Sequence, residues 1–260
     1  MIFNKDCRNL TKWDGDVLIT DPPYRAHVHK SAASQSLKKG TTSRDFGFDH
    51  LSASLRRWTC RLAATVPRWS VIFTDVESAG WWRIGLECAG AQYIRTIPWV
   101  RWSMPQLSGD RPPSGCELIV LAHGKAKKHW NGPGSLTHLA HTCMRGSEKH
   151  KAEKPLDLML DLVSWFSDVG DVVLDPFAGS GTTGLASHLL KRDFKGTELD
   201  PIWASRAKVR ASSDALSDRD AGQYEKWRES KRVFDIDKAR RDAHTAKVRA
   251  KMDAKKAVGG

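Results

Sequence analysis

Two short apolar runs in this chain each end in an aspartate that is followed at once by proline. The run Val17–Thr20 leads into Asp21–Tyr24, and the run Val172–Leu174 leads into Asp175–Thr183. Apolar runs of this length predict buried strands, and the loops at the carboxyl ends of strands collect the ligands of an open α/β sheet. Because the two loops differ in chemistry, we expect two ligands to meet over one sheet.

The loop after the second run is rich in glycine and hydroxyl groups. Gly179 and Gly181 permit positive φ and close approach of a ligand to the backbone, and the hydroxyls around them can cap a helix that begins near Thr182. The loop lacks the Gly-Lys-Ser/Thr ending of a P-loop and the third glycine of the dinucleotide fingerprint. Asp175 would repel a pyrophosphate, so a cofactor with a charged amino group is favoured. A tight turn in an ordinary βαβ unit is the alternative.

The loop after the first run is a stiff acceptor site. Pro22 and Pro23 fix φ and remove two backbone donors, so Asp21 and the Pro22 carbonyl form an acceptor pair suited to an –NH2 group. Tyr24 adds an aromatic face for a planar ring. The lone pair of an exocyclic base amine is delocalised, and acceptors on its hydrogens would stabilise positive charge that develops on the nitrogen. A proline turn with an exposed tyrosine is the alternative.

The two loops, in this order, resemble the amino DNA methyltransferases that use S-adenosylmethionine, in their β-type arrangement. In that family a DPPY motif comes first, target recognition follows, and the cofactor half comes last. His150–Leu156 is similar to the family's H-x-x-E-K-P-L element, and Gly196–Asp200 to its G-x-E-x-D motif. Ile2–Cys7 resembles its third cofactor strand, although Lys5 stands where the family usually has glycine. Arg101 takes the place of lysine in the family's W-x-K…E pattern.

The resemblance implies a fold and a reaction. The fold class is α/β, with a doubly wound, mainly parallel sheet of the Rossmann-like methyltransferase type, circularly permuted so that the catalytic half precedes the cofactor half. The reaction is methyl transfer to an amine of a flipped-out base in double-stranded DNA. Aspartate at the head of the acceptor motif favours adenine N6. Cytosine N4 or RNA methylation stays open, and so does a non-catalytic DNA-binding protein that retains the fold.

The resemblance also implies the residues of the site. The catalytic residues are Asp21, Pro22, Pro23 and Tyr24. The cofactor-binding residues are Asp6, Lys154, Asp175, Phe177, Gly179, Ser180, Gly181, Thr182 and Glu198. Within this set we expect Asp175, Gly179 and Ser180 at the methionine end of the cofactor and Asp6 at the adenine. Glu198 is expected at the ribose, as is common for an acid one βα unit after a glycine loop.

Two irregular regions carry cations and hydrogen-bond donors suited to DNA. Residues 25–50 form a basic stretch beside the acceptor loop, which can place its cations on phosphates. Residues 97–115 carry donors that read guanine and adenine edges. The DNA-binding candidates are Arg25, Lys30, Arg101, Trp102, Gln106 and Arg111. Trp102 and Trp130 are the candidates for base stacking. For each cation, a phosphate contact or plain solvation is the alternative.

Between the two loops the apolar spacing predicts alternating helices and strands, which indicates a mainly parallel sheet. The expected helices are Leu51–Val66, Ala79–Ala89 and Pro155–Phe166. The expected strands are Ser70–Asp75, Ala91–Ile97 and Glu117–His123. We divide the chain into a methyltransferase domain, 1–213, and a basic helical tail, 214–260. Within the domain lie the catalytic half, the target-recognition region and the cofactor half, over residues 1–97, about 98–150 and 151–213.

Composition narrows the partners. The chain of 260 residues carries 42 Lys and Arg against 30 Asp and Glu, a net charge of +12, which favours a polyanionic partner. Its five dispersed cysteines and the absence of a membrane-length apolar run favour a cytoplasmic protein with reduced thiols, either nucleoid-associated or in the cytoplasm of a host cell. His138, His141 and Cys143 lack the paired spacing of zinc ligands, so no metal is expected. A homodimer is consistent with the resemblance.

Overall fold

A computed structural model of the protein describes residues 1–24, 51–101, 115–134, 138–141, 153–212 and 216–232. The chain divides into two compact units, Met1–Ala215 and Leu216–Gly260. In the described part of the second unit, residues 218–232 form one helix, in which the rings of Tyr224 and Trp227 stack 6.2 Å apart. No helix within the described ranges is long and apolar enough to cross a membrane.

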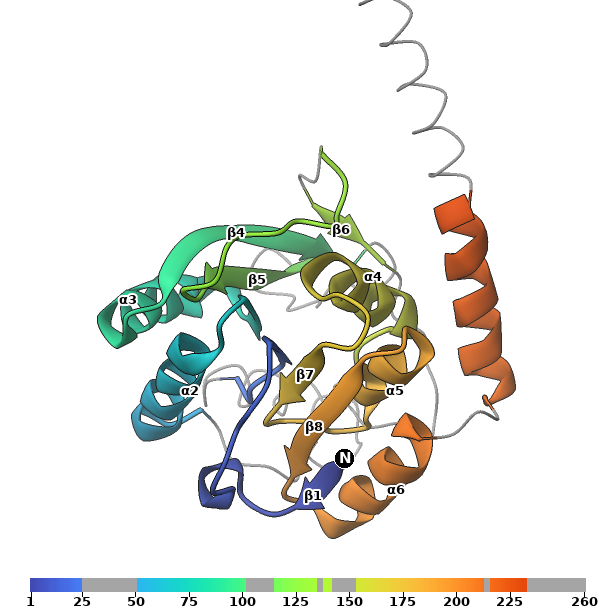
Figure 1. Ribbon diagram of the computed structural model, residues 1–260, viewed down its shortest axis with the longest axis horizontal. Helices are drawn as coiled ribbons and strands as arrows, with labels where there is room; N and C mark the ends of the chain where they lie inside the picture. Colours follow the sequence, from blue (N-terminus) through green and yellow to red (C-terminus); the bar gives the residue numbers. More distant parts are fainter. Residues whose placement is uncertain (25–50, 102–114, 135–137, 142–152, 213–215, 233–260) are drawn as a thin grey trace, which may run out of the picture. The chain divides into compact units, whose positions relative to one another are not determined.

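The first unit is built on a sheet whose described strands follow the order β1-β8-β7-β2-β3-β5-β4-β6 (Figure 1). The strands are β1 Ile2–Asn4, β2 Val17–Thr20, β3 Trp69–Thr74, β4 Gln92–Val100, β5 Cys116–His123, β6 Leu139–Ala140, β7 Val172–Asp175 and β8 Asp193–Glu198. The helices are α2 Ala53–Thr65, α3 Ala79–Ala89, α4 Leu156–Phe166, α5 Thr182–Leu189 and α6 Pro201–Ala211, with short 3-10 turns η1 Cys7–Asn9 and η2 Val76–Ser78.

The sheet is mainly parallel. β1, β8, β7, β2 and β3 pair in parallel, β5 pairs antiparallel with both β3 and β4, and β6 lies parallel to β4. The strand that carries the acceptor loop, β2, comes before the strand that carries the glycine loop, β7, although the two are neighbours in the sheet. The doubly wound, permuted fold class expected from the sequence is therefore confirmed.

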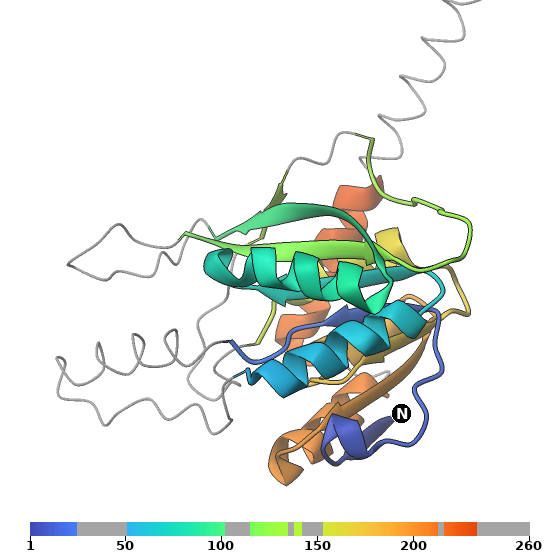
Figure 2. The same ribbon diagram turned by 90° about the vertical axis from the view of Figure 1, so that its left-hand side faces the viewer.

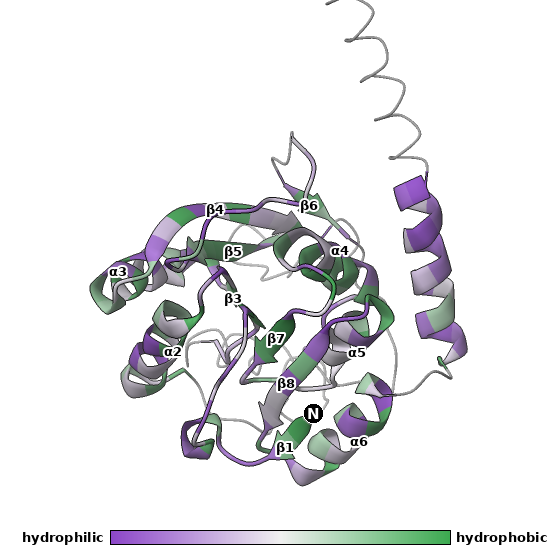
Figure 3. Ribbon diagram, in the orientation of Figure 1, coloured by the Kyte–Doolittle hydropathy of each residue, from purple (hydrophilic) through white to green (hydrophobic). Residues whose placement is uncertain are grey.

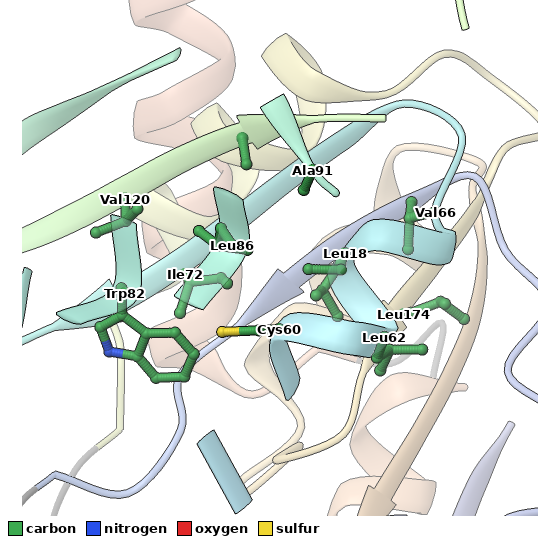
Figure 4. Packing of buried hydrophobic residues seen from close by; sticks show 12 residues of the cluster. Leu18, Cys60, Leu62, Val66, Ile72, Trp82, Leu86, Ala91, Val120 and Leu174 are labelled. Carbon is green, nitrogen blue, oxygen red and sulfur yellow. The ribbon is translucent and has the colours of Figure 1, made fainter. Parts of the chain in front are cut away.

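Helices cover both faces of this sheet. Figure 1 shows α2 and α3 on one side and α4, α5 and α6 on the other, and Figure 2 shows α2 and α3 running alongside the strands. One face packs a core in which β2, β3, β5 and β7 meet the two helices; its buried members include Leu18, Cys60, Leu62, Ile72, Trp82, Leu86, Val120 and Leu174 (Figure 4). Figure 3 shows hydrophobic residues concentrated on β5, β7 and α4, while the helix of the second unit is largely hydrophilic.

The helices and strands begin and end close to their expected residues, with one larger difference. Ser52 caps α2 by accepting from the Leu55 amide at 3.1 Å, and Gly90 ends α3 in the left-handed region at φ 93°. The expected strand from Ala91 to Ile97 runs on to Val100, because these residues pair with the start of β5. Residues 98–100, which the sequence predicted in the irregular region 97–115, thus belong to the sheet.

Candidate active site

The acceptor loop and the glycine loop leave the sheet side by side. β2 and β7 pair in parallel, with Val17 opposite Val173 and Leu18 opposite Leu174. To one side of this pair the sheet continues through β8 and β1, and to the other side through β3. A point where the strand order diverges in this way opens a crevice at the carboxyl ends of the strands. The two loops thus leave neighbouring strands at one edge of the sheet, and the meeting of two ligands there stays a prediction.

Asp21 is held in a network of charged and polar side chains. Lys154 Nζ donates to Asp21 Oδ2 at 2.5 Å and lies 3.3 Å from Glu117 Oε2. Tyr24 donates its hydroxyl to Glu117 Oε2 at 2.6 Å, and Arg101 Nη1 lies 3.1 Å from Glu117 Oε1. The second oxygen of Asp21, Oδ1, is buried and has no hydrogen-bond partner among the described residues. We call these five side chains the acceptor cluster.

The topology of the sheet explains how distant residues reach this cluster. Because β5 runs antiparallel to β3, its first residues lie at the edge where β3 ends, with Leu118 opposite Thr74. Glu117 therefore reaches the edge that carries the acceptor loop. Arg101 follows the last residue of β4, opposite the start of β5, and Lys154 lies just ahead of α4.

The electrostatics of the acceptor cluster favour the charged forms of Lys154 and Glu117, whereas the pKa of Asp21 lies above its ordinary value. Burial works against the charge on Lys154, but Asp21 and Glu117 together raise its pKa above the ordinary value. Burial likewise works against the charge on Glu117, but Lys154 and Arg101 hold the pKa of that carboxyl below its usual value. Burial raises the pKa of Asp21, Lys154 opposes the rise, and Glu117 adds to it. Burial and Glu117 raise the pKa of Tyr24, which keeps its hydroxyl a donor.

Three aromatic rings lie close to the Lys154 ammonium. Its Nζ lies 5.6 Å from the ring centroid of Tyr24, 5.0 Å from that of Phe73 and 5.9 Å from that of Trp99. The negative faces of such rings attract a cation and exclude water from it. The ammonium is therefore fixed by two carboxylates within a largely apolar setting.

Asp175, at the end of β7, has different partners. Its carboxylate accepts from the hydroxyls of Thr20 and Thr183, both at 2.7 Å, and from the Phe177 amide at 3.0 Å. The residue is 2% exposed, and burial raises its pKa to about 7. All these donors are neutral and come from the protein itself. Asp175 thus joins the last residue of β2 to both ends of the glycine loop.

The glycine loop adopts the backbone that its sequence predicts. Gly179 has φ 51° and Gly181 has φ 79°, so the predicted positive φ is confirmed at both. A Cβ on Gly181 would lie 2.9 Å from Cα of Ala207 in α6, so this glycine also permits close helix packing. The predicted capping of α5 by a hydroxyl is wrong: Gly181 itself is the N-cap, and it has no side chain to accept a bond.

Glu198 and Asp6 follow two neighbouring strands next to the glycine loop. Glu198 Oε2 accepts from the Gly179 amide at 2.8 Å, and Oε1 accepts from the Asp200 amide at 2.9 Å. Asp6 follows β1, which pairs with β8, but its carboxylate is taken up by Arg8 at 2.5 Å. Glu198 thus lies against the loop, whereas Asp6 has an ionic partner of its own.

Two residues that the sequence interpretation did not select complete the glycine-loop side. Arg210 of α6 places Nη1 3.3 Å from the Ser180 carbonyl oxygen and 3.1 Å from Thr182 Oγ1. The same nitrogen lies 3.2 Å from Glu153 Oε1. Glu153 precedes Lys154, so one dipeptide contacts the acceptor loop through Lys154 and reaches the glycine loop through Arg210. The E-K-P element contained the signal for Glu153, while nothing local in the helix sequence marks Arg210.

Not every predicted site residue lies where the sequence interpretation put it. Lys154, predicted among the cofactor residues, contacts the acceptor loop, and Arg101, predicted to bind DNA, is paired with Glu117. Trp130 packs against Trp69 at the start of β3, at the edge of the sheet opposite to the acceptor loop. The remaining DNA-binding candidates lie outside the described residues: Arg25, Lys30, Trp102, Gln106 and Arg111.

The histidines considered as metal ligands have other partners where they are described. His141 Nδ1 lies 3.2 Å from an Asp157 oxygen and Nε2 lies 3.1 Å from an Asp161 oxygen. Although burial acts to lower it, these two carboxylates of α4 raise the pKa of His141 to about 9. Across the described ranges, no group of three or more histidine, cysteine or acidic side chains is arranged to hold a metal ion. Cys143 lies outside those ranges.

The fold and the two loops resemble those of a methyltransferase, and comparison with known proteins agrees. Residues 136–208 match the N6_N4_Mtase family model, whose description is DNA methylase. Over 229 residues the chain is 27% identical to the Type II methyltransferase M2.DpnII of Streptococcus pneumoniae, covering 76% of this chain and 83% of the relative.

Solved structures give the same result. The M1.HpyAVI complex with S-adenosylmethionine is 28% identical, with a TM-score of 0.62 over 80% of this chain and 98% of that one. PvuII DNA methyltransferase, which is cytosine-N4-specific, has a TM-score of 0.59 at 12% identity over 87% of this chain and 90% of that one, and so shows the fold alone. These matches confirm the resemblance to the amino DNA methyltransferases, with S-adenosylmethionine as the cofactor of the class. They do not separate adenine N6 from cytosine N4.

Proposed function

We propose that this protein transfers the methyl group of S-adenosylmethionine to N6 of an adenine in double-stranded DNA. The observation that carries the proposal is Asp21: one carboxylate oxygen is held by Lys154, and the other is buried without a partner among the described residues. A buried acceptor left without a donor costs free energy, and an amine hydrogen of the substrate would satisfy it. Asparagine or serine at this position would lack the negative charge.

The residues of the acceptor loop perform the chemistry. Asp21 Oδ1 and the Pro22 carbonyl accept the two hydrogens of the target amine, which turns the nitrogen lone pair out of the ring plane. The carboxylate stabilises the positive charge that develops on nitrogen, in a site where that stabilisation is preorganised. Tyr24 stacks on the base, and its hydroxyl is fixed by Glu117 at 2.6 Å. Asp21 then takes up the proton that the methylated amine releases.

The residues around the glycine loop fit the cofactor. Gly179 has no Cβ and lies at φ 51°, so a ligand can approach its backbone closely. Gly179, Phe177 and Glu198 are each partly exposed. When bound, the cofactor supplies an electrophilic methyl group on a sulfonium. We propose that Glu198 accepts from the ribose hydroxyls and that Asp175 acts by holding the loop in shape. The adjacency of β2 and β7 supports an arrangement in which the amine and the methyl group meet in line.

Adenine is proposed because an aspartate heads the acceptor motif, as is more typical of N6-adenine enzymes of this class than of N4-cytosine enzymes. The base must leave the duplex to reach a buried carboxylate, so base flipping is part of the proposal. The net charge of +12 favours the polyanionic substrate and predicts salt-sensitive binding. The DNA-reading residues are proposed from the sequence: Arg25, Lys30, Trp102, Gln106 and Arg111.

The test is to incubate the protein with unmethylated duplex DNA and S-adenosylmethionine, digest to nucleosides and identify the product by mass spectrometry. N6-methyladenine is expected, and it should be absent with Asp21→Ala but present with Asp14→Ala. Asp14 is the matched control because it is a 55% exposed side chain paired with Lys12. N4-methylcytosine would overturn the choice of base. Product from an RNA substrate alone would overturn the substrate, and no product from either would overturn the proposal.

A further inference from the structure

The Lys154 ammonium lies where elements that are far apart in the sequence come together. Asp21 follows β2, Glu117 lies in β5, and Lys154 precedes α4. The Lys154 side chain is 10% exposed, and the side chains of Asp21 and Glu117 are 22% and 12% exposed. A cation buried to this extent is retained only when its charge is balanced, because an unpaired buried charge is strongly unfavourable. Both carboxylates are within 3.3 Å of its nitrogen.

These contacts constrain how the Asp21 carboxylate can turn. The terminal torsion of an aspartate is broad and roughly two-fold, so an isolated carboxylate samples many orientations. Here Oδ2 is fixed by Lys154 at 2.5 Å, while Glu117 and the surrounding rings fix the ammonium in its turn. The proline after Asp21 restrains the backbone. Oδ1 is thereby held in one direction, buried and without a donor among the described residues.

Resting on the proposed function, we propose that Lys154 is a positioning residue that holds Asp21 so that Oδ1 faces the target amine. Lys154 touches neither the base nor the cofactor in this account and acts through Asp21. The glycine loop has a different cation, because Arg210 contacts the Ser180 carbonyl and Thr182 Oγ1. Each loop thus has its own basic residue, and Lys154 serves the acceptor loop.

The charges around Asp21 provide a readout that a merely structural role would not change. The groups that face Asp21 or its partners are Lys154, Glu117, Tyr24, Arg101 and Asp175. Burial raises the pKa of Asp21 most; among these groups Lys154 lowers it, Glu117 raises it, and Tyr24 lowers it. Loss of the Lys154 charge should therefore raise the pKa of Asp21 further. Because Asp21 must be ionised to accept from the amine, the acid limb of the activity profile should move to higher pH.

The experiment compares the wild type with Lys154→Met, Lys154→Arg and Lys12→Met across a range of pH. Lys12 is the matched control, since it makes the same change of charge on a 78% exposed side chain. For Lys154→Met we expect kcat to fall about 100-fold, as for loss of one preorganised charge contact, with unchanged affinity for S-adenosylmethionine by calorimetry. The acid limb of its pH–activity profile should move to higher pH. Lys154→Arg should keep the acid limb of the wild type and part of its kcat. Lys12→Met should match the wild type.

Three outcomes would overturn the inference. Weaker cofactor binding in proportion to the lost rate would make Lys154 a cofactor ligand. If the acid limb of the pH–activity profile is the same in Lys154→Met as in the wild type, Lys154 has only a structural role. If Lys154→Met does not fold, a shifted limb in Lys154→Arg, which keeps the charge, would contradict the inference. Methylated nucleoside must first appear with the wild type, so its absence would be recognised as failure of the proposed function itself.

Discussion

Asp21 and Asp175 end neighbouring strands of the same sheet, and both are followed by proline, yet their surroundings differ. Asp21 is set among charged groups, with Lys154 on one oxygen and no described donor on the other. Asp175 is set among neutral donors, with Thr20 and Thr183 hydroxyls and an amide on its two oxygens. A carboxylate oxygen without a donor from the protein can accept a hydrogen bond from a substrate. A carboxylate whose two oxygens already have donors instead maintains the shape of a loop.

In the proposed function, the two aspartates of this crevice therefore differ in role: Asp21 takes part in the chemistry, and Asp175 maintains the structure of the glycine loop. On the acceptor side, the opposing charges of Lys154, Arg101, Asp21 and Glu117 lie close together, and Lys154 opposes the rise that burial causes in the pKa of Asp21. On the glycine side, burial raises the pKa of Asp175 to about 7, and its hydrogen-bond donors among the described residues are all neutral. The predictions below test this division of roles, starting with the largest expected effect.

Removal of the Asp21 carboxylate should abolish methyl transfer. Asp21→Ala should lower the rate by at least about 1000-fold, the upper end of the loss when one preorganised electrostatic group is removed. Binding of S-adenosylmethionine should be unchanged, because the glycine loop is held by Asp175. Calorimetry measures the binding, and nucleoside mass spectrometry measures the transfer. Loss of cofactor affinity in this variant would contradict the division of roles.

A side chain at Gly181 should destabilise the glycine-loop side. Gly181→Ala imposes φ 79° on an L-residue and brings its Cβ to 2.9 Å from Ala207, and we expect a loss of about 3 kcal/mol in the free energy of unfolding. Gly80→Ala is the control, since Gly80 lies in α3 and a Cβ there meets nothing within 4 Å. It should stabilise by about 1 kcal/mol. Denaturant unfolding measures both changes. A change in the free energy of unfolding that has the same sign in both variants would refute this prediction.

Asp175→Asn should change how stability depends on pH. The pKa of Asp175 is raised in the folded protein to about 7 from an ordinary 3.8, so the native state binds more protons than the unfolded state between these values. Its contribution to stability is therefore full below pH 4 and is lost as the pH rises to 7, by about 1.4 kcal/mol per unit. The asparagine variant should lack this decline. Parallel wild-type and variant curves from pH 4 to 7 would show that Asp175 is not buried as described.

Arg210 should matter for cofactor binding and little for the acceptor loop. Arg210→Met removes the contacts to Ser180 and Thr182, and we expect about tenfold weaker binding of S-adenosylmethionine, or about 1.4 kcal/mol. Arg206→Met is the control on the same helix, because Arg206 lies over the Trp203 ring. The rate at saturating cofactor should stay near that of the wild type. A lost rate with unchanged affinity would place Arg210 on the acceptor side.

The sequence predicted the parts of this site that follow from strand ends. Parallel strands carry their following loops at one edge, so Asp21 and Asp175 could be brought together from their apolar runs alone. The positive φ at Gly179 and Gly181 was predictable from glycine. The fold class followed from the resemblance, and the topology confirms it.

The contacts within the acceptor cluster could not be predicted from the sequence. Lys154 and Asp21 are 133 residues apart, and Tyr24 and Glu117 are 93 apart, and no local pattern specifies which charges pair across such distances. The end of β4 was missed for another reason. The prolines and glycines of residues 97–115 predicted an irregular region, but Pro98 pairs with Leu118 on one side only, ahead of the pairing of Trp99 with β6, where a missing amide is tolerated.

The central claim is that the open oxygen of Asp21 performs chemistry while the filled carboxylate of Asp175 maintains shape. Its most direct test is the single-turnover rate of methyl transfer to duplex DNA, at saturating cofactor, for Asp21→Ala and Asp175→Asn side by side. We expect no product above background from the first variant, and a rate within about tenfold of the wild type from the second, a change of no more than about 1.4 kcal/mol in the barrier. Equal losses in both variants, or a greater loss in Asp175→Asn, would contradict the account.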